Sequence, residues 1–157
     1  MRQIWAPWRM EYIMMEKAEG CILCQKPAEK NDTANYILYR AKRNFIVLNL
    51  YPYTPGHLMI APYCHVASLD DLTPEELHEH IDIVAHTIQV LRRELNPGGF
   101  NIGVNLGKAA GAGITDHVHT HVVPRWQGDT NFMPVFSDAR VIPEGLDETY
   151  RKLKGKF

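Results

Sequence analysis

Short runs of β-branched and aromatic residues alternate with polar turns that contain glycine, proline or asparagine along much of the chain. Runs of this length and composition are typical of β-strands. They predict five strands, at residues 36–40, 45–50, 57–63, 100–106 and 117–123. A short polar turn at 42–44 separates the first two runs, which indicates a hairpin.

The segment after the third predicted strand follows a helical period instead. Its apolar residues recur at alternating steps of four and three, which places them on one face of a helix. They are Leu77, Ile81, Val84, Ile88, Leu91 and Leu95. Thr73 and Glu76 have the spacing of a capping box, with Pro74 suited to the first helical position. These signals predict a helix over residues 74–95, which the following Asn-Pro-Gly-Gly sequence ends.

Two histidines, His78 and His80, flank this apolar stripe, and we expect both side chains to be solvated. A second, shorter helix is expected near residues 147–154. Strands on both sides of one long helix are typical of the α+β class. The sequence therefore predicts an α+β fold with about five strands in a mostly antiparallel sheet, one long helix and a short C-terminal helix.

Composition agrees with an ordinary globular protein. Hydrophobic residues make up 45% and charged residues 22% of the 157 residues, and the formal net charge is −1. This length suits one domain over residues 1–157, made of an N-terminal segment (1–35), a core (36–125) and a tail (126–157). Proteins that bind nucleic acids or anionic membranes normally carry an excess of basic residues. This chain has none, so we expect neither partner.

The sequence also bears on the cellular compartment. It contains no run of the roughly eighteen apolar residues that a membrane helix needs. Its first twenty residues lack the continuous apolar region and small-residue cleavage site of a signal peptide. The three cysteines do not form the even-numbered framework of a small secreted protein. We therefore expect a cytoplasmic protein.

The strongest chemical signal is a row of alternating histidines, His117, His119 and His121, in the fifth predicted strand. Because side chains alternate between the faces of a strand, the three imidazoles share one face. Burying polar rings without partners is costly, so a purely structural role for all three is disfavoured. Two chemical roles remain open: ligands of a catalytic metal, or a nucleophilic imidazole flanked by helpers.

A second signal is the Cys-x-x-Cys pair formed by Cys21 and Cys24. Two thiolates are half of a tetrahedral zinc site and need two further ligands. A redox dithiol is the competing interpretation, but such pairs normally open a helix after a strand. We expect the third cysteine, Cys64, to be a small buried hydrophobic residue, with a role as substitute ligand as the less favoured alternative.

These features resemble the histidine triad family of nucleotide hydrolases and transferases. The sequence His-Val-His-Thr-His-Val-Val-Pro-Arg at 117–125 carries the resemblance. The segment from Asn49 to His57 is similar to the family's upstream segment, and His65 and the long helix follow in the family's order. The resemblance covers residues 21–125.

The flanks of this region resemble a subgroup of the family. They are the sequence Trp-Gln-Gly-Asp-Thr-Asn-Phe at 126–132 and the pair Trp5 and Trp8. The subgroup includes diadenosine tetraphosphate phosphorylases. The resemblance implies an adenine dinucleotide polyphosphate, or another nucleotide, as the substrate.

The resemblance also implies a role for each catalytic histidine. His119 matches the residue that attacks the α-phosphorus of a bound nucleotide and forms a nucleotidyl-histidine intermediate. A neutral imidazole suits this role because it is nucleophilic near pH 7. His121 is then a hydrogen-bond partner of a phosphate or leaving oxygen, and His57 is an outer member of the same network.

Substrate contacts follow from the same resemblance. The residues that it assigns to substrate are Asn49, Asn105, Gly111, Gly113, Thr115, Ile46 and Leu48. Asn49 meets the ribose in this scheme, and Ile46 and Leu48 lie near the adenine. Asn105 and the amides around the two glycines hold phosphate oxygens, because small residues let the backbone approach a phosphate.

In zinc-bearing members of the family, a cysteine pair of this spacing joins the His before the long helix and the first His of the triad. The resemblance thus implies one structural zinc per subunit, held by Cys21, Cys24, His65 and His117. This zinc would pin the N-terminal segment to the sheet. The family pairs through the long helix and an adjacent strand, so the resemblance also implies a homodimer.

One loop departs from the family's pattern. Hydrolase members carry a glutamine or serine just before the triad, whereas residues 112–116 are Ala-Gly-Ile-Thr-Asp, in which Thr115 is the available substitute. This loop suits inorganic phosphate as the acceptor, and we expect phosphorolysis to ATP and ADP ahead of hydrolysis. The alternatives are a hydrolase of diadenosine polyphosphates or nucleoside phosphoramidates, and a nucleotide-binding interaction module with little catalysis.

Overall fold

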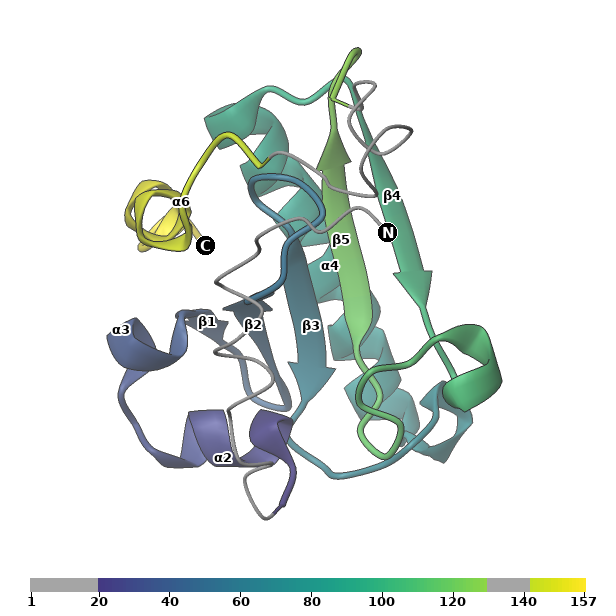
Figure 1. The fold of residues 1–157 in the computed structure, drawn as a ribbon. Helices are drawn as coiled ribbons and strands as arrows, with labels where there is room; N and C mark the ends of the chain where they lie inside the picture. Colours follow the sequence, from purple (N-terminus) through teal and green to yellow (C-terminus); the bar gives the residue numbers. More distant parts are fainter. Residues whose placement is uncertain (1–19, 130–141) are drawn as a thin grey trace, which may run out of the picture.

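One five-stranded antiparallel sheet forms the centre of the computed structural model, which describes residues 20–129 and 142–157 (Figure 1). Its strand order is β1-β2-β3-β5-β4. The strands are β1 (Ile37–Arg40), β2 (Asn44–Leu48), β3 (Leu58–Pro62), β4 (Gly99–Val104) and β5 (Thr120–Arg125). The predicted α+β class and the antiparallel hairpin of the first two strands are confirmed.

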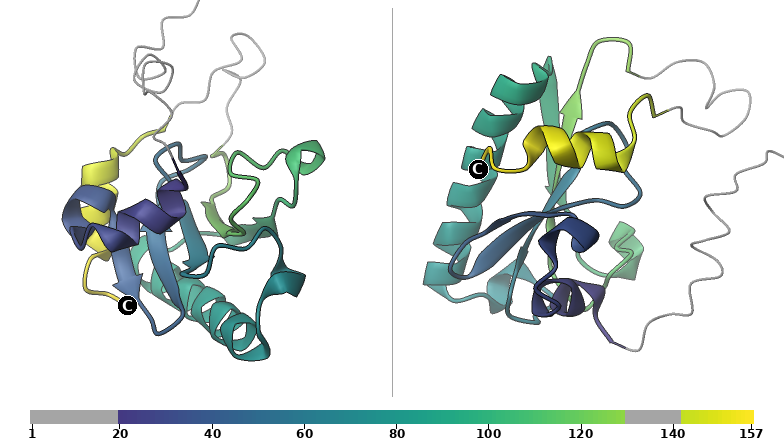
Figure 2. Two further views of the ribbon diagram at one scale, coloured as in Figure 1. Left: turned by 90° about the horizontal axis from the view of Figure 1, so that it is seen from below. Right: turned by 90° about the vertical axis from the view of Figure 1, so that its left-hand side faces the viewer.

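The long helix α4 (Pro74–Leu95) covers one face of this sheet (Figure 2). The predicted bounds are confirmed, and so is the capping box: the Thr73 hydroxyl accepts from the Glu76 amide and the Glu76 carboxylate accepts from the Thr73 amide. Asn96 ends the helix in the left-handed conformation. Residues 20–129 and 142–157 also contain the helices α2 (Ile22–Ala28), α3 (Asp32–Asn35) and α6 (Leu146–Leu153) and the short 3-10 turns η1 (Leu69–Asp71) and η2 (Lys108–Ala110).

The side of α4 that packs on the sheet differs from the predicted stripe. Its buried residues are His80, Ile83, Val84, Thr87, Val90 and Leu91. Ile81 is 56% exposed, and His80 is fully buried, so the expectation that His80 is solvated is wrong. The helix is turned toward His80 because Asn44 and Thr120 on the sheet supply hydrogen bonds to both of its ring nitrogens.

The opposite face of the sheet is covered in part by the segment that contains α2 and α3, which the sequence did not predict as helices. Leu23 of α2 packs with Phe45 and Val47 in a second apolar cluster. The Arg40 guanidinium donates to the Asp32 carboxylate and to the Pro27 carbonyl, which ties both helices to β1. This segment brings the cysteine pair to the sheet.

The last strand begins later than predicted. Residues 117–119 lie before β5, and the Val118 amide donates to the Val66 carbonyl at 2.7 Å instead of to a neighbouring strand. From Thr120 onward β5 pairs with both β3 and β4. The predicted alternation of side chains holds at this boundary, since the Thr120 hydroxyl meets His80 on α4 while the rings of His119 and His121 lie against each other.

None of the helices within residues 20–129 and 142–157 is long and apolar enough to cross a membrane. Trp5, Trp8 and positions 130–132 of the tail sequence lie outside the described residues.

Candidate active site and metal centre

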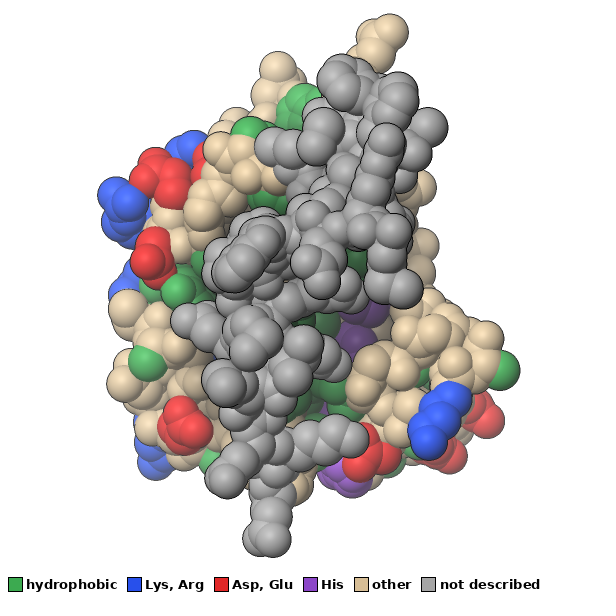
Figure 3. Space-filling model, in the orientation of Figure 1, with side chains coloured by type: hydrophobic (Ala, Val, Ile, Leu, Met, Phe, Trp, Pro, Cys, Tyr) green, Lys and Arg blue, Asp and Glu red, His purple; other side chains and the backbone are tan. Residues whose placement is uncertain are grey.

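Two histidines of the row, His119 and His121, lie where β5 begins, on the face of the sheet away from α4. Histidine side chains reach the surface on this face (Figure 3). The two ring centroids are 4.9 Å apart and the rings are nearly perpendicular. His121 pairs with Met59 in the sheet, whereas Thr120 between the two histidines points to α4. The strand thus presents the two rings together and buries the intervening hydroxyl.

The protonation of His119 follows from its backbone partner. Its Nδ1 lies 2.9 Å from the carbonyl oxygen of His117. A carbonyl can only accept, so Nδ1 carries the proton and the lone pair of a neutral ring is on Nε2. Within the described parts of the chain, Nε2 of His119 makes no hydrogen bond. The ring therefore presents a nucleophilic nitrogen in a fixed orientation.

His57 and His121 belong to a chain of hydrogen bonds in which every donor is determined. The backbone amide of Tyr53 donates to Nδ1 of His57 at 3.1 Å, so the proton of His57 is on Nε2. That Nε2 lies 3.0 Å from Nδ1 of His121 and donates to it. The proton of His121 is consequently on its Nε2, which makes this atom a hydrogen-bond donor.

Burial keeps these two histidines neutral. Burial, followed by the charges of the neighbouring His121 and His119, lowers the pKa of His57 to about 3. Burial, followed by the charge of His119, also lowers the pKa of His121 to about 4. Both rings are therefore uncharged at neutral pH, as the hydrogen-bond chain requires.

A cavity of about 300 Å³ opens beside His121 on the β4–β5 side of the sheet. Asn105 and Arg125 lie in its wall with Tyr53. Arg125 forms an ion pair with Asp129, which holds the guanidinium in place. The cavity thus brings together His121 and the predicted phosphate contact Asn105, which are far apart in sequence.

The loop between β4 and β5 supplies backbone amides. Gly107 and Gly111 both have positive φ, which a glycine adopts without strain. The Gly111 amide donates to the Lys108 carbonyl, so it is already used inside the loop. From Gly113 to Asp116 the amides donate to no acceptor among the described residues, so they are available to an anion.

Asn49 lies next to the histidine chain. Its Oδ1 accepts from the Tyr51 amide at 2.9 Å, which turns its Nδ2 toward His57 Nε2 at 3.4 Å. The side chain is half-buried at the end of β2. Asn49, the predicted ribose contact, and His57, the predicted outer histidine, are therefore neighbours.

The cysteine pair meets His65 and His117 at the other end of the row. One ligand atom from each of Cys21, Cys24, His65 and His117 lies within 4.8 Å of the others. Nδ1 of His117 is 3.3 Å from Cys21 Sγ and 3.4 Å from Cys24 Sγ, and Nδ1 of His65 is 3.4 Å from Cys24 Sγ. Two sulfurs and two imidazole nitrogens at these separations fit the tetrahedral donor set of zinc.

The surroundings of this cluster also suit a metal. Nε2 of His117 lies 2.9 Å from the Pro62 carbonyl, so its proton is there and Nδ1 is free to bind a cation. Burial, followed by the neighbouring Cys21 thiol, raises the pKa of Cys24 to about 11, so this thiol keeps its proton at neutral pH unless a bound cation displaces it. Cys64 does not belong to the cluster and is half-buried, so its expected full burial is wrong.

Comparison with known proteins agrees with this arrangement. The profile of the HIT domain matches residues 30–128. The chain is 39% identical over 165 aligned positions to a Mycobacterium tuberculosis protein named AP-4-A phosphorylase, covering 98% of this chain and 83% of that protein. The chain belongs to the HIT, or histidine triad, family.

Two further HIT relatives are informative. The asymmetrical bis(5'-nucleosyl)-tetraphosphatase of Schizosaccharomyces pombe is 35% identical over 100 aligned positions, which cover 64% of this chain and 54% of that protein. A crystal structure described as a zinc-bound histidine triad family protein from Mycobacterium smegmatis superposes with a TM-score of 0.69 at 28% identity. That match covers 87% of this chain and 92% of the other.

Two apolar residues expected near the adenine lie elsewhere in this HIT fold. Ile46 and Leu48 are fully buried in the core beneath α4. Ile46 pairs with Ile60, which pairs with Thr120, and this row of the sheet points to α4. Their side chains do not reach the histidine face. Val47 does, since it pairs with Met59 opposite His121.

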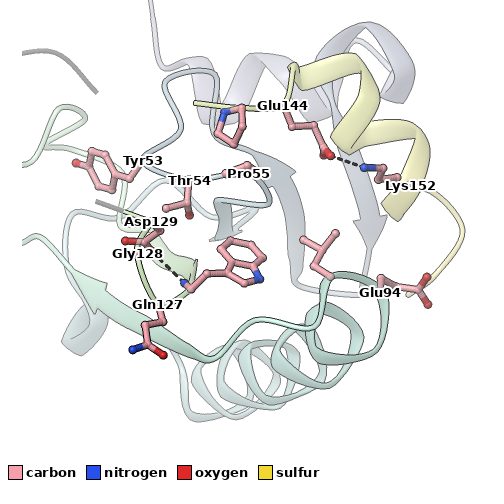
Figure 4. A pocket seen from close by; sticks show the side chains of 12 residues that line it. Tyr53, Thr54, Pro55, Glu94, Gln127, Gly128, Asp129, Glu144 and Lys152 are labelled. Carbon is pink, nitrogen blue, oxygen red and sulfur yellow. Dashed lines mark hydrogen bonds and ion pairs between the residues drawn. The ribbon is translucent and has the colours of Figure 1, made fainter. Parts of the chain in front are cut away.

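A larger cavity, of about 540 Å³, lies beyond the end of β5 (Figure 4). Tyr53, Trp126 and Asp129 line it, and the Glu144–Lys152 ion pair closes one side. No histidine lines it. The smaller cavity, which His121 lines, is therefore the better candidate for the substrate site.

Proposed function

We propose that this protein cleaves dinucleoside polyphosphates by transferring a nucleotidyl group to Nε2 of His119. The observation that carries the proposal is the bond between Nδ1 of His119 and the His117 carbonyl, which leaves Nε2 unprotonated and without a partner among the described residues. The names of relatives support the substrate class: two of them are an AP-4-A phosphorylase and a tetraphosphatase.

The first step uses the two rings in opposite roles. The Nε2 lone pair of His119 forms a bond to the α-phosphorus, and the bond from that phosphorus to the bridging oxygen breaks. The leaving polyphosphate oxygen accepts a hydrogen bond from Nε2 of His121, whose donor role follows from the His57 chain, and it departs as an anion while His121 keeps its proton. From diadenosine tetraphosphate this step releases ATP and leaves adenylyl-His119.

The second step returns the enzyme to its starting state. An acceptor oxygen attacks the phosphorus, the P–N bond breaks, and His119 regains its lone pair. Inorganic phosphate as the acceptor yields ADP, and water yields AMP and releases a proton to the solvent. We favour phosphate, because residues 112–116 lack a glutamine or serine and because an AP-4-A phosphorylase is 39% identical. Hydrolysis is the second candidate, which the similarity to the Schizosaccharomyces pombe tetraphosphatase favours.

We assign the substrate contacts by position. Asn49 takes the ribose, and Asn105 takes nonbridging oxygens from the wall of the cavity beside His121. The amides from Gly113 to Asp116, which include Thr115, hold the negative charge that develops at the phosphorus. Gly111 contributes the positive-φ turn that exposes them.

We also propose a structural zinc at Cys21, Cys24, His65 and His117, one per subunit. The donor set and its separations support it, as does the similarity to a zinc-bound family member. Such an ion would hold the N-terminal segment against the residues that precede β5. No step of the reaction uses it.

A homodimer is the assembly that we propose. β4 is an edge strand, and Ile102 on it is 46% exposed. Ile81 on α4 is 56% exposed. Apolar groups on an unpaired edge and on the helix support an interface through both elements. We propose the cytoplasm as the compartment, because the absence of a disulfide among the three cysteines, all within the described residues, suits a reducing environment.

Product analysis tests this function. Purified protein is incubated with diadenosine tetraphosphate, with and without inorganic phosphate, and the nucleotides are separated. Formation of ADP and ATP that depends on phosphate supports a phosphorylase. Formation of AMP and ATP regardless of phosphate supports the hydrolase instead. Nucleotide binding without any turnover would leave a binding module and refute both.

A further inference from the structure

The core beneath the active site contains a polar residue with a defined set of partners. His80 on α4 is fully buried. Its Nδ1 lies 2.8 Å from Oδ1 of Asn44 on β2, and its Nε2 lies 2.7 Å from Oγ1 of Thr120 on β5. A buried imidazole is stable only when both nitrogens are satisfied, and here the two partners come from two different strands.

The direction of these hydrogen bonds is determined at Asn44. The amide nitrogen of Asn44 donates to the Glu79 carboxylate at 2.9 Å and to the Glu76 carbonyl at 3.3 Å. Its oxygen therefore faces His80 and accepts, so the proton of His80 is on Nδ1. Nε2 of His80 is left as an acceptor, and the Thr120 hydroxyl donates to it.

Thr120 connects this network to the reaction site. It lies between His119 and His121 in sequence, and its side chain points to α4 while their rings lie against each other on the opposite face of the sheet. It is also the first residue of β5, where it pairs with Ile60 and Val104. Before this point the chain is outside the sheet, so the Thr120 hydroxyl anchors the strand next to the candidate nucleophile.

We propose that His80 is a positioning residue, which through the Thr120 hydroxyl sets the orientation of the strand that carries His119 and His121. The apolar neighbours of Thr120 on the same face, Val118 and Val122, pack without directional bonds. A hydrogen bond at 2.7 Å specifies the rotation of the strand, which packing alone leaves freer. Nucleophilic attack is sensitive to displacements well below the size of a methyl group.

The neutral state of His80 suits this role. Burial lowers the pKa of His80 to about 4, and its direct partners, Asn44 and Thr120, carry no charge. The nearest carboxylate in the network, that of Glu79, is reached through Asn44. At neutral pH Nε2 is therefore always available to accept the Thr120 proton.

The inference rests on the proposed function, and two substitutions of one side chain test it. Thr120→Val keeps the shape and removes the donor, whereas Thr120→Ser keeps the donor and removes a methyl group. For diadenosine tetraphosphate we expect Thr120→Val to lower kcat at least about tenfold with KM changed less than about threefold. Thr120→Ser should restore kcat to within about threefold of the wild-type value.

A matched control comes from the same helix. Thr87 is buried on α4, and its hydroxyl has no hydrogen-bond partner in the part of the chain that the structure describes. Thr87→Val makes the same chemical change outside the network, so kcat should stay at the wild-type level. If Thr120→Val lowers only the melting temperature and keeps the wild-type kcat, or if serine fails to restore kcat, His80 is a structural core residue and the proposal is wrong.

Nitrogen NMR of the histidine rings separates this proposal from the proposed reaction. It needs no turnover, so it decides the matter even if the protein cleaves no dinucleotide. We expect His80 as the Nδ1–H tautomer, and we expect Thr120→Val, but not Thr87→Val, to shift the ring signals of His119 and His121. An Nε2–H tautomer of His80, or unchanged signals of the two rings, would overturn the proposal.

Discussion

The carbonyl oxygen of His117 lies 2.9 Å from Nδ1 of His119, so a single residue belongs to two sites. The side chain of His117 contributes to the cysteine–histidine cluster, and its backbone orients the candidate nucleophile. A displacement of His117 moves the acceptor that holds the His119 ring. The proposed metal centre and the proposed active site are therefore coupled through one residue.

This coupling predicts the effect of removing the metal ligands. The double substitution Cys21→Ser and Cys24→Ser should abolish zinc binding and lower the melting temperature by more than about 5 °C, because the N-terminal segment loses its attachment. Turnover should fall but persist, since no step uses the ion. Metal analysis and thermal unfolding measure both effects. Cys64→Ser, outside the cluster, is the control and should keep one zinc per chain.

Retention of zinc in the double variant would contradict this assignment. It would indicate that the ion binds elsewhere, as a catalytic metal on the histidine row would require. The structure argues against such a metal site, because His117 belongs to the cysteine cluster while His119 bonds to a backbone carbonyl.

The roles of the two rings predict different losses. His119→Ala removes the atom that forms the covalent bond, so turnover should fall at least about a thousandfold while nucleotide affinity stays within about threefold. His121→Ala removes the Nε2 donor to the leaving oxygen and should cost about ten- to a hundredfold in kcat. Steady-state kinetics and calorimetric titration with nucleotide measure these quantities. Equal turnover of His119→Ala and wild type would end the nucleophile assignment.

The open space beside Gly113 predicts a change of acceptor. A Cβ built on Gly113 meets no atom within 4 Å, and its φ is not in the left-handed region. Gly113→Gln should therefore fold normally and place an amide in the loop that holds no glutamine or serine. We expect it to raise AMP formation in the absence of phosphate by at least about tenfold. Gly113→Ala is the control, and equal AMP formation by both variants would show that the loop does not select the acceptor.

Stability should fall in mild acid because of His80. Its pKa is about 4 in the folded protein against an ordinary value of 6.5. Between these values the unfolded chain binds a proton and the folded protein does not, so the free energy of unfolding falls as the pH drops from about 6.5 to about 4. At about 1.4 kcal/mol per unit of pKa, the loss is on the order of 3 kcal/mol.

His57 and His121 act in the same direction, since their pKa values are also lowered. Urea unfolding at pH 7 and pH 5 measures the total. The variant His80→Gln lacks the contribution of His80, so its free energy of unfolding should change less between the two pH values. An identical change in the variant and the wild type would mean that His80 is protonated in the folded state.

Much of the fold could be predicted because its signals are local. The capping box at Thr73 and Glu76 and the apolar runs of the strands each depend on neighbouring residues. The side on which α4 is buried could not be predicted in this way. His80 is buried because Asn44 and Thr120, 36 and 40 positions away, supply its hydrogen bonds, and no sequence period contains that information.

The candidate site likewise has features that the sequence predicts and features that depend on distant residues. The alternation of His119 and His121 follows from the period of a strand, whereas the position of Ile46 depends on which face of β2 meets the helix. One residue of register separates Ile46 from Val47, and only the pairing through β3 to β5 shows which of them lies on the histidine face. Helix α2 contains a proline, Pro27, which removed the usual sequence signal for a helix.

Detection of the covalent intermediate tests the central claim most directly. The enzyme is mixed with diadenosine tetraphosphate without phosphate, quenched under conditions that preserve a P–N bond, digested and analysed by mass spectrometry. Our account predicts an adenylyl group on His119 that is lost when phosphate is added before quenching and is absent in His119→Ala. An adenylyl group on another residue, or turnover with no adduct on His119, would contradict it.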